Sequence, residues 1–245
     1  MGETLLTVDV GNSLVKLSVF EGERVVYAAH GKGLGSEAVE AVLDFHTLDG
    51  AAYCAVGEDS GNIRDFLEEL EIPTLILDSR TPLPIEVRYE SRDSLGADRL
   101  CAAIGAVAPG ESALVVDAGT AVTADVVADG VFLGGNISPG LALRFMSLNR
   151  YTSKLPAVEA HGDIPPFGYN TETAIRAGVV RGLAAEIAAD FAEALKINEN
   201  MKIILTGGDA GVLYPFLQAA GLEADLAENA VGVGLVRIFN HNNCL

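Results

Sequence analysis

The sequence has 245 residues, 49% of them hydrophobic, so it can bury a sizeable core as one or two domains of ordinary size. Its 16 Lys and Arg stand against 34 Asp and Glu, a formal net charge of -18. A surface this acidic repels nucleic-acid phosphates and anionic lipid headgroups, so we expect neither a nucleic acid nor a membrane as a partner.

The cysteines and the first residues indicate the compartment. Cys54, Cys101 and Cys244 form no C-x-x-C pair, which argues against a zinc site or a disulfide framework and fits a reducing environment. Glu3 stands where a signal peptide carries basic charge, and no apolar run approaches the roughly 20 residues that span a bilayer. We therefore expect a cytoplasmic protein with no targeting segment.

Extended segments open each half of the chain. Three are expected in each half: residues 4–10, 14–20 and 24–29, and then residues 112–117, 121–128 and 131–137. Asp129-Gly130 predicts a tight hairpin turn in the second set. Asp9 aligns with Asp117 and is followed by a glycine turn in the same way, so the two β-meanders indicate a duplication.

Helices and short apolar strands follow each meander. The clearest helix is expected over residues 171–196, with Asn170 or Thr171 as its N-cap. It carries an apolar stripe spaced by four residues: Ile175, Val179, Leu183, Ile187, Phe191 and Leu195. The pattern predicts an α/β protein of two lobes, residues 1–109 and 110–245.

Each meander carries an acidic turn. The two turns read Asp9-Val-Gly-Asn-Ser13 and Asp117-Ala-Gly-Thr-Ala121. A carboxylate that ends a strand can orient hydrated Mg2+, and a glycine lets backbone N–H groups reach phosphate oxygens. One such turn is about as often a plain hairpin, but two copies in duplicated meanders favour phosphate binding. Lys16 can reach the phosphates from the second strand.

Two further motifs carry candidate chemistry. Thr206-Gly-Gly-Asp209 ends an apolar strand and opens a helix, where a nucleotide can meet free backbone amides, although Gly-Gly is also an ordinary turn. Asp98 falls in the first turn of a predicted helix and can accept a proton from an attacking alcohol. Arg99 can bind an anionic group of the substrate. The alternative is a capping aspartate beside a surface arginine.

The order of these elements resembles known kinases. Two acidic turns followed by Gly-Gly resemble the nucleotide-binding set of the superfamily that holds acetate and sugar kinases, heat-shock chaperone ATPases and actin. This resemblance implies duplicated ribonuclease H-like lobes, the actin-like ATPase fold, with a nucleotide cleft between them. Nearly the whole chain is similar to type III pantothenate kinases, the Bvg accessory factor family. Six strings occur in that family's order: Asp9-Val-Gly-Asn-Ser13, Leu95-Gly-Ala-Asp-Arg99, Asp117-Ala-Gly-Thr-Ala121, Gly134-Gly-Asn-Ile-Ser-Pro-Gly140, Asn170-Thr-Glu-Thr-Ala-Ile-Arg-Ala-Gly178 and Thr206-Gly-Gly-Asp209.

The resemblance implies transfer of the ATP γ-phosphate to the primary hydroxyl of pantothenate, the first step of coenzyme A biosynthesis. Mg2+ accompanies the ATP. Asp98 matches the family's proton acceptor, and Asp117 matches its ligand for a monovalent cation, K+ or NH4+. The expected ATP contacts are Thr120 and the first turn with its flanks: Asp9, Val10, Gly11, Asn12, Ser13, Leu14, Val15 and Lys16. The expected pantothenate contacts are Tyr89, Gly96, Ala97, Asp98 and Arg99.

The resemblance also implies a homodimer with the substrate site at its interface. Thr171 matches a substrate contact that the family supplies from the second subunit. A dimer would give the apolar stripe of the helix over residues 171–196 a role in packing between subunits.

The sequence departs from the family in two places. Ser91-Arg92 follows Tyr89 and Glu90, where the family usually has x-Asn-Pro, so a stiffening proline is lost. Ser13 stands where threonine is commoner and keeps the hydroxyl. Two other functions stay open: another small-molecule kinase of the superfamily, and a nucleotide-binding regulator without transfer activity.

Overall fold

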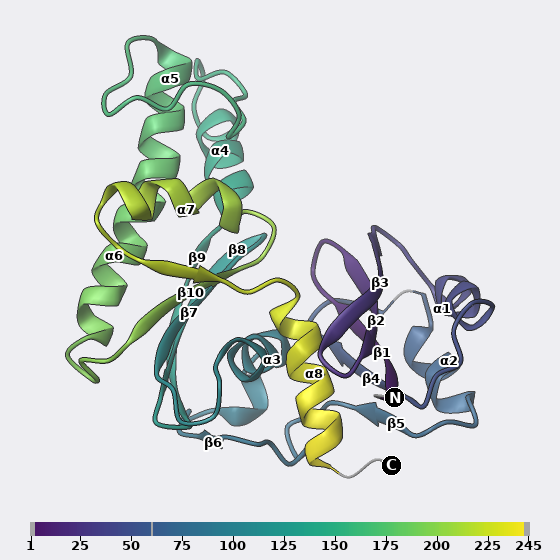
Figure 1. Ribbon diagram of the computed structural model, residues 1–245. Coiled ribbons are helices and arrows are strands. Elements are labelled where there is room, and N and C mark those ends of the chain that lie inside the picture. The colour runs from purple at the N-terminus through teal and green to yellow at the C-terminus, as the bar shows by residue number, and fades with distance from the viewer. Residues whose placement is uncertain (1–2, 60, 243–245) are drawn as a thin grey trace. The chain divides into compact units, whose positions relative to one another are not determined.

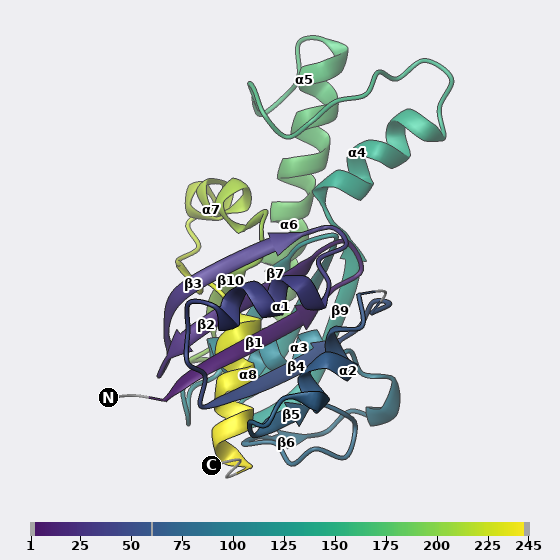
Figure 2. The same cartoon turned by 90° about the vertical axis from the view of Figure 1, so that its right-hand side faces the viewer.

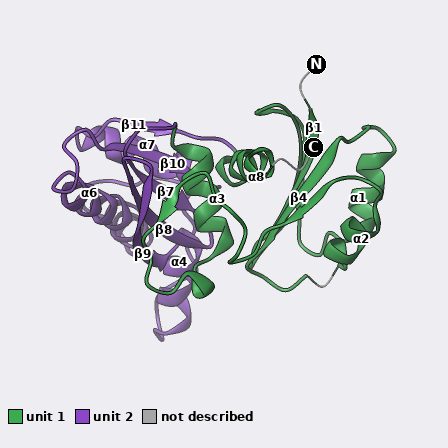
Figure 3. Cartoon of the chain, turned by 90° about the horizontal axis from the view of Figure 1, so that it is seen from below, with its two compact units in different colours: residues 1–108, 229–245 green, residues 109–228 purple. Residues whose placement is uncertain are grey.

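The computed structural model describes residues 3–59 and 61–242, and Cys244 lies outside the described residues (Figure 1). The chain forms two compact units, Met1–Ala108 with Asn229–Leu245, and Pro109–Glu228 (Figure 3). Within the described residues, no helix is both long enough and apolar enough to cross a bilayer.

The first unit is built on a five-stranded sheet. Its spatial order is β3 (Arg24–Gly31), β2 (Val15–Glu21), β1 (Thr4–Val10), β4 (Gly50–Ala55) and β5 (Thr74–Ile76). The first three strands in sequence form an antiparallel meander, and β4 and β5 add in parallel. Short β6 (Glu86–Val87) and a 3-10 turn (Arg92–Ser94) follow β5.

Helices cover both faces of this sheet. α1 (Ser36–Leu43) and α2 (Ile63–Glu69) pack on one face, where they share a core with the alternate, inward-pointing residues of β1 (Figure 2). α8 (Ala230–His241) lies on the opposite face, beside α3 (Ala97–Ala106). Because both faces are covered, β1 is buried along almost its whole length.

The unit to which α8 belongs differs from the one expected when the chain is divided at residue 109. The sequence pattern assigns all of residues 110–245 to the second lobe, but α8 belongs to the first unit. The reason is close helix packing: a Cβ on Gly105 would lie 1.9 Å from the Ala230 carbonyl oxygen, and a Cβ on Gly234 would lie 2.0 Å from that of Cys101. Arg237 then donates to the carbonyl oxygen of Ile104 at 2.7 Å, near the end of α3.

The second unit repeats the topology of the first. Its strands lie in the order β9 (Val131–Pro139), β8 (Ala121–Ala128), β7 (Ala113–Ala118), β10 (Lys202–Thr206) and β11 (Ala224–Leu226). Here too a meander of three antiparallel strands is extended by two parallel ones. Asp129 (φ 52°) and Gly130 (φ 77°) form the predicted hairpin turn. The predicted duplication is confirmed.

A long helix forms much of the second unit's core. It comprises α5 (Thr171–Arg176), a π-helical turn (Ala177–Arg181) and α6 (Gly182–Ala194). Asn170 caps it, because its side chain accepts from the Thr173 N–H at 2.9 Å. α4 (Leu141–Arg150) and α7 (Ala210–Ala219) complete the unit.

The apolar stripe of this helix is not a free surface. Ile175, Val179, Leu183 and Ile187 are all buried in the core of their own unit, Phe191 is partly buried, and Leu195 is exposed. The expectation that this stripe packs against a second subunit is therefore wrong. The error arises because an apolar stripe looks the same in sequence whether its partner is the same chain or another.

Candidate functional site

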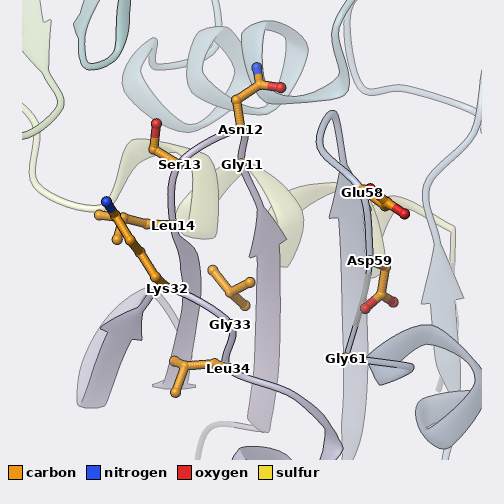
Figure 4. Close-up of a pocket in the computed structure, with 11 residues that line it drawn as sticks. Gly11, Asn12, Ser13, Leu14, Lys32, Gly33, Leu34, Glu58, Asp59 and Gly61 are labelled. Atoms are coloured by element: carbon orange, nitrogen blue, oxygen red, sulfur yellow. The ribbon is translucent and has the colours of Figure 1, made fainter.

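The first acidic turn joins β1 to β2 in the first unit. Gly11 donates its N–H to the Leu14 carbonyl oxygen at 3.0 Å, which closes the turn, and Asn12 and Ser13 stand exposed at its tip. A pocket of about 370 Å³ lies beside it, lined by residues 11–15, Lys32, Gly33, Leu34, Glu58, Asp59 and Gly61 (Figure 4). The pocket is large enough for phosphate groups, and residues 11–15 of the turn form part of its wall.

Asp9 lies in a row of three side chains on adjacent strands. Lys16 on β2 and Cys54 on β4 are its direct partners in the two strand pairings. Lys16 Nζ is 3.7 Å from Asp9 Oδ2, and Cys54 Sγ is 3.8 Å from Asp9 Oδ1. Burial raises the pKa of Asp9, the charge of Lys16 opposes this, and the charge of Asp98 adds to it. Asp9 and Asp98 therefore act electrostatically on one another.

Asp98 is the second residue of α3 and folds back on the start of its helix. Its Oδ1 accepts from the Arg99 N–H at 2.8 Å. A Cβ on residue 96 would lie 2.5 Å from that oxygen, so this carboxylate position requires the glycine that precedes it, Gly96. Gly96 and Ala97 also line a pocket of about 350 Å³ with Arg92.

Two expected substrate residues meet next to Asp98. The Arg99 guanidinium carbon is 5.6 Å from the centre of the Tyr89 ring, a cation–π contact, and Arg99 is buried. The loop between Tyr89 and Arg99 lacks the proline that is usual in the family, and hydrogen bonds hold it in place instead. Ser94 donates to the Ser91 hydroxyl at 2.8 Å, and Arg92 donates to the Thr81 carbonyl oxygen at 3.0 Å.

The second acidic turn lies in the second unit, between β7 and β8. Gly119 donates to the Ala121 carbonyl oxygen at 3.1 Å, and Thr120 accepts from the Gly140 N–H at 3.0 Å. Gly207 has φ +89°, and a Cβ there would lie 2.3 Å from Asp117 Oδ1. The Asp117 carboxylate position therefore requires a glycine at residue 207, the first of the Gly-Gly motif.

Asp209 and Thr171 are placed elsewhere in the second unit. Asp209 accepts a backbone hydrogen bond from Leu141 at the start of α4, and burial raises the pKa of its carboxyl group. It lines a pocket of about 580 Å³ with Phe145, Met146 and the 157–161 segment. Thr171 is the first residue of α5 and is exposed.

The sequence pattern missed three residues that line or support these sites. Lys32 and Asp59 line the pocket beside the first turn (Figure 4), and Cys54 contacts Asp9. Lys32 and Asp59 sit in connecting loops without a motif, so no sequence signal marks them. Cys54 could have been found, because a parallel strand after a meander places its last residues beside the acidic turn.

Known structures share the fold of this chain. A Campylobacter jejuni protein described as a Baf family transcriptional activator aligns with a TM-score of 0.65 and 22% identity, over 98% of this chain and 100% of that one. A Sinorhizobium meliloti protein described as a 2-dehydro-3-deoxygalactonokinase aligns with a TM-score of 0.58 and 18% identity, over 97% and 99%. The predicted duplicated ribonuclease H-like fold of actin-like ATPases is confirmed.

Sequence comparison identifies the family. The profile of type III pantothenate kinases matches residues 5–192. A type III pantothenate kinase of Phocaeicola vulgatus is 40% identical over 207 residues, which cover 83% of this chain and 86% of that protein. The residues that the profile matches include the first acidic turn, the Asp98 motif and the second acidic turn. The chain belongs to the type III pantothenate kinase family.

Proposed function

We propose that Asp98 accepts the proton when the chain carries out its family's reaction, transfer of the ATP γ-phosphate to the primary hydroxyl of pantothenate. The observation that carries this proposal is that the Asp98 turn lies beside the end of β1: a Cβ on Gly96 would lie 3.7 Å from the Val56 side chain, and the Val56 N–H donates to the Val10 carbonyl oxygen, next to Asp9. The charge of Asp98 also contributes to the raised pKa of Asp9. An alcohol next to Asp98 would then lie near a phosphate held at Asp9. An aspartate beside the attacking hydroxyl is the arrangement that phosphoryl transfer needs, since positioning and charge supply most of the catalysis.

The first turn is proposed to bind the ATP phosphates. The residues assigned to this role are the ones expected from sequence, Asp9 to Lys16. A kinase of this family uses ATP with a divalent metal, for which we propose Mg2+. Asp9 fits such an ion, because a carboxylate whose pKa is raised by burial gains most from a nearby cation. The ion, when bound, neutralises phosphate charge during transfer.

The second turn is proposed to hold a monovalent cation, K+ or NH4+, at Asp117, with Thr120 contacting ATP. Two features support this assignment. The neighbours of Asp117 in the sheet are the uncharged Thr123 and Thr206, and Gly207 leaves its carboxylate uncrowded. A weakly hydrated cation suits a site that offers one carboxylate among neutral oxygens.

Pantothenate is proposed to bind at Tyr89, Gly96, Ala97, Asp98 and Arg99. Arg99 offers a planar cation suited to the substrate's carboxylate, and the ring of Tyr89 lies against it. Gly96 and Ala97 line a pocket of about 350 Å³ that could hold the rest of the substrate.

We further propose a cytoplasmic homodimer in which Thr171 of one chain reaches the substrate of the other. Since the helical stripe is buried, another surface must form the interface. Tyr151, Phe167 and Tyr169, which lie between α4 and α5, are 80%, 90% and 71% exposed. Large aromatic side chains at this exposure favour that region as the contact surface.

A coupled assay tests this function. Turnover of ATP is measured with Mg2+ and either pantothenate or a panel of sugars and other alcohols, in K+, NH4+ or Na+. We expect turnover with pantothenate that depends on K+ or NH4+. Preference for a sugar would contradict the substrate, and ATP binding without transfer to any alcohol would indicate a regulator.

A further inference from the structure

Two buried thiols lie beside Asp9 in the first unit. Cys54 faces Asp9 across the parallel pairing of β1 with β4, and its Sγ is 3.8 Å from Asp9 Oδ1. Cys101 on α3 forms a hydrogen bond with Cys54. Both cysteines are free thiols with 0% exposure. They join the strand that carries Asp9 to the helix that carries Asp98.

The chemistry of the groups sets the direction of these bonds. An ionised carboxylate only accepts hydrogen bonds, so Cys54 must donate its S–H to Asp9. The Cys54 sulfur has then used its one proton and can only accept from Cys101. The donors therefore run from Cys101 to Cys54 to Asp9.

Cys54 is the more rigid of the two contacts of Asp9. Lys16 holds Oδ2, but its side chain is 49% exposed and can move with solvent. Cys54 holds Oδ1 from a strand whose residues are packed on both faces. Cys54 therefore holds one carboxylate oxygen in place even when the Lys16 side chain moves.

We propose that Cys54, supported by Cys101, is a positioning residue that fixes the Asp9 carboxylate in the orientation that binds metal–ATP. This inference rests on the proposed role of Asp9 in nucleotide binding. It assigns to the two cysteines a role in substrate affinity, which differs from simple core packing.

An isosteric pair of variants separates these roles. Cys54→Val removes the donor, and Cys54→Thr keeps one in a side chain of the same shape. We expect Cys54→Val to raise KM for MgATP and the calorimetric Kd for MgATP roughly tenfold, with KM for pantothenate unchanged. Cys54→Thr should stay within about threefold of the parent protein. Cys101→Ala, which removes only the supporting donor, should have a smaller effect than Cys54→Val.

Other outcomes overturn the proposal. Equal MgATP affinity of the Val and Thr variants would show that the donor is irrelevant, and an equal rise in KM for both substrates would indicate packing alone. If either variant does not fold, Cys54→Ser against Cys54→Ala gives the same comparison. If the parent protein binds MgATP but does not phosphorylate pantothenate, the proposed function fails, while the calorimetric comparison still decides the role of Cys54.

Discussion

The two acidic turns join equivalent strands, but they differ in length and in their neighbours. In the first unit the row across the sheet is Lys16, Asp9 and Cys54, and in the second unit the equivalent row is Thr123, Asp117 and Thr206. Asp9 thus has a cation and a thiol beside it, whereas Asp117 has two hydroxyl-bearing residues. A duplicated fold sets where a carboxylate stands, but the side chains on the adjacent strands determine what it can bind.

The largest effect is expected from a residue that belongs to neither turn. Asp98→Asn keeps the size of the side chain but removes the proton acceptor, so turnover should fall by a factor on the order of 100 or more. KM for MgATP and activation by K+ should change little, because both turns remain. Steady-state kinetics with a melting curve as the folding control would check this. Near-normal turnover would refute the role of Asp98.

The next effect should distinguish the turns from one another. Asp117→Asn removes the charge from the proposed cation site, so the K+ concentration needed for half-maximal activity should rise on the order of tenfold. Asp9→Asn is the matched control, because it should weaken MgATP binding and leave the K+ requirement of the remaining activity unchanged. The comparison between the turns would fail if both variants altered the same ligand.

Gly207 of the second unit and Ala55 of the first unit occupy equivalent positions, and exchanging glycine and alanine there should affect stability differently. Gly207→Ala places a Cβ 2.3 Å from Asp117 Oδ1 at φ +89°, so the second unit should lose about 1–3 kcal/mol of stability. The register places Ala55 at the matching position of the first unit. Ala55→Gly should therefore cost less, about 1 kcal/mol or below. Chemical denaturation of both variants measures the contrast, and equal losses would contradict it.

The smallest effect concerns stability and pH. Because the pKa of Asp9 is raised, the folded protein holds a proton that the unfolded chain releases above its ordinary value of 3.8. Stability from this group is therefore full below that value and is lost as pH rises through the raised pKa. Asp9→Asn should raise the melting temperature of the unliganded protein at pH 7 by about 2 °C. A lower melting temperature would show that the Lys16 contact outweighs the burial.

Local sequence was enough to predict the strands, the turns and the duplication. β-branched strands with Asp129-Gly130 between them predict a meander, and the structure has that hairpin. The Asn170 cap was one of two residues expected from the sequence, and the capping box decides between them. These features depend on contacts within a few residues, so the pattern alone contains them.

Features made by distant segments could not be predicted. The contacts of Gly105 with Ala230 and of Gly234 with Cys101 join helices far apart in the chain, and neither glycine belongs to a recognisable motif. Similarly, Cys101 reads as an apolar helix residue until the fold brings it to Cys54. The six short strings indicated which residues belong to the candidate site. Why some of them must be glycine, such as Gly96 beside Asp98, follows only from the three-dimensional contacts.

The return of α8 to the first unit bears on how the chain acquires its structure during synthesis. α8 covers one face of the sheet built on β1, yet the ribosome produces it only after the entire second unit. One apolar face of the N-terminal sheet therefore stays uncovered until α8 is synthesised, whereas residues 109–228 can complete their own core before then. We infer that the later-synthesised unit is the first to finish folding, the reverse of the usual order in which N-terminal domains lead.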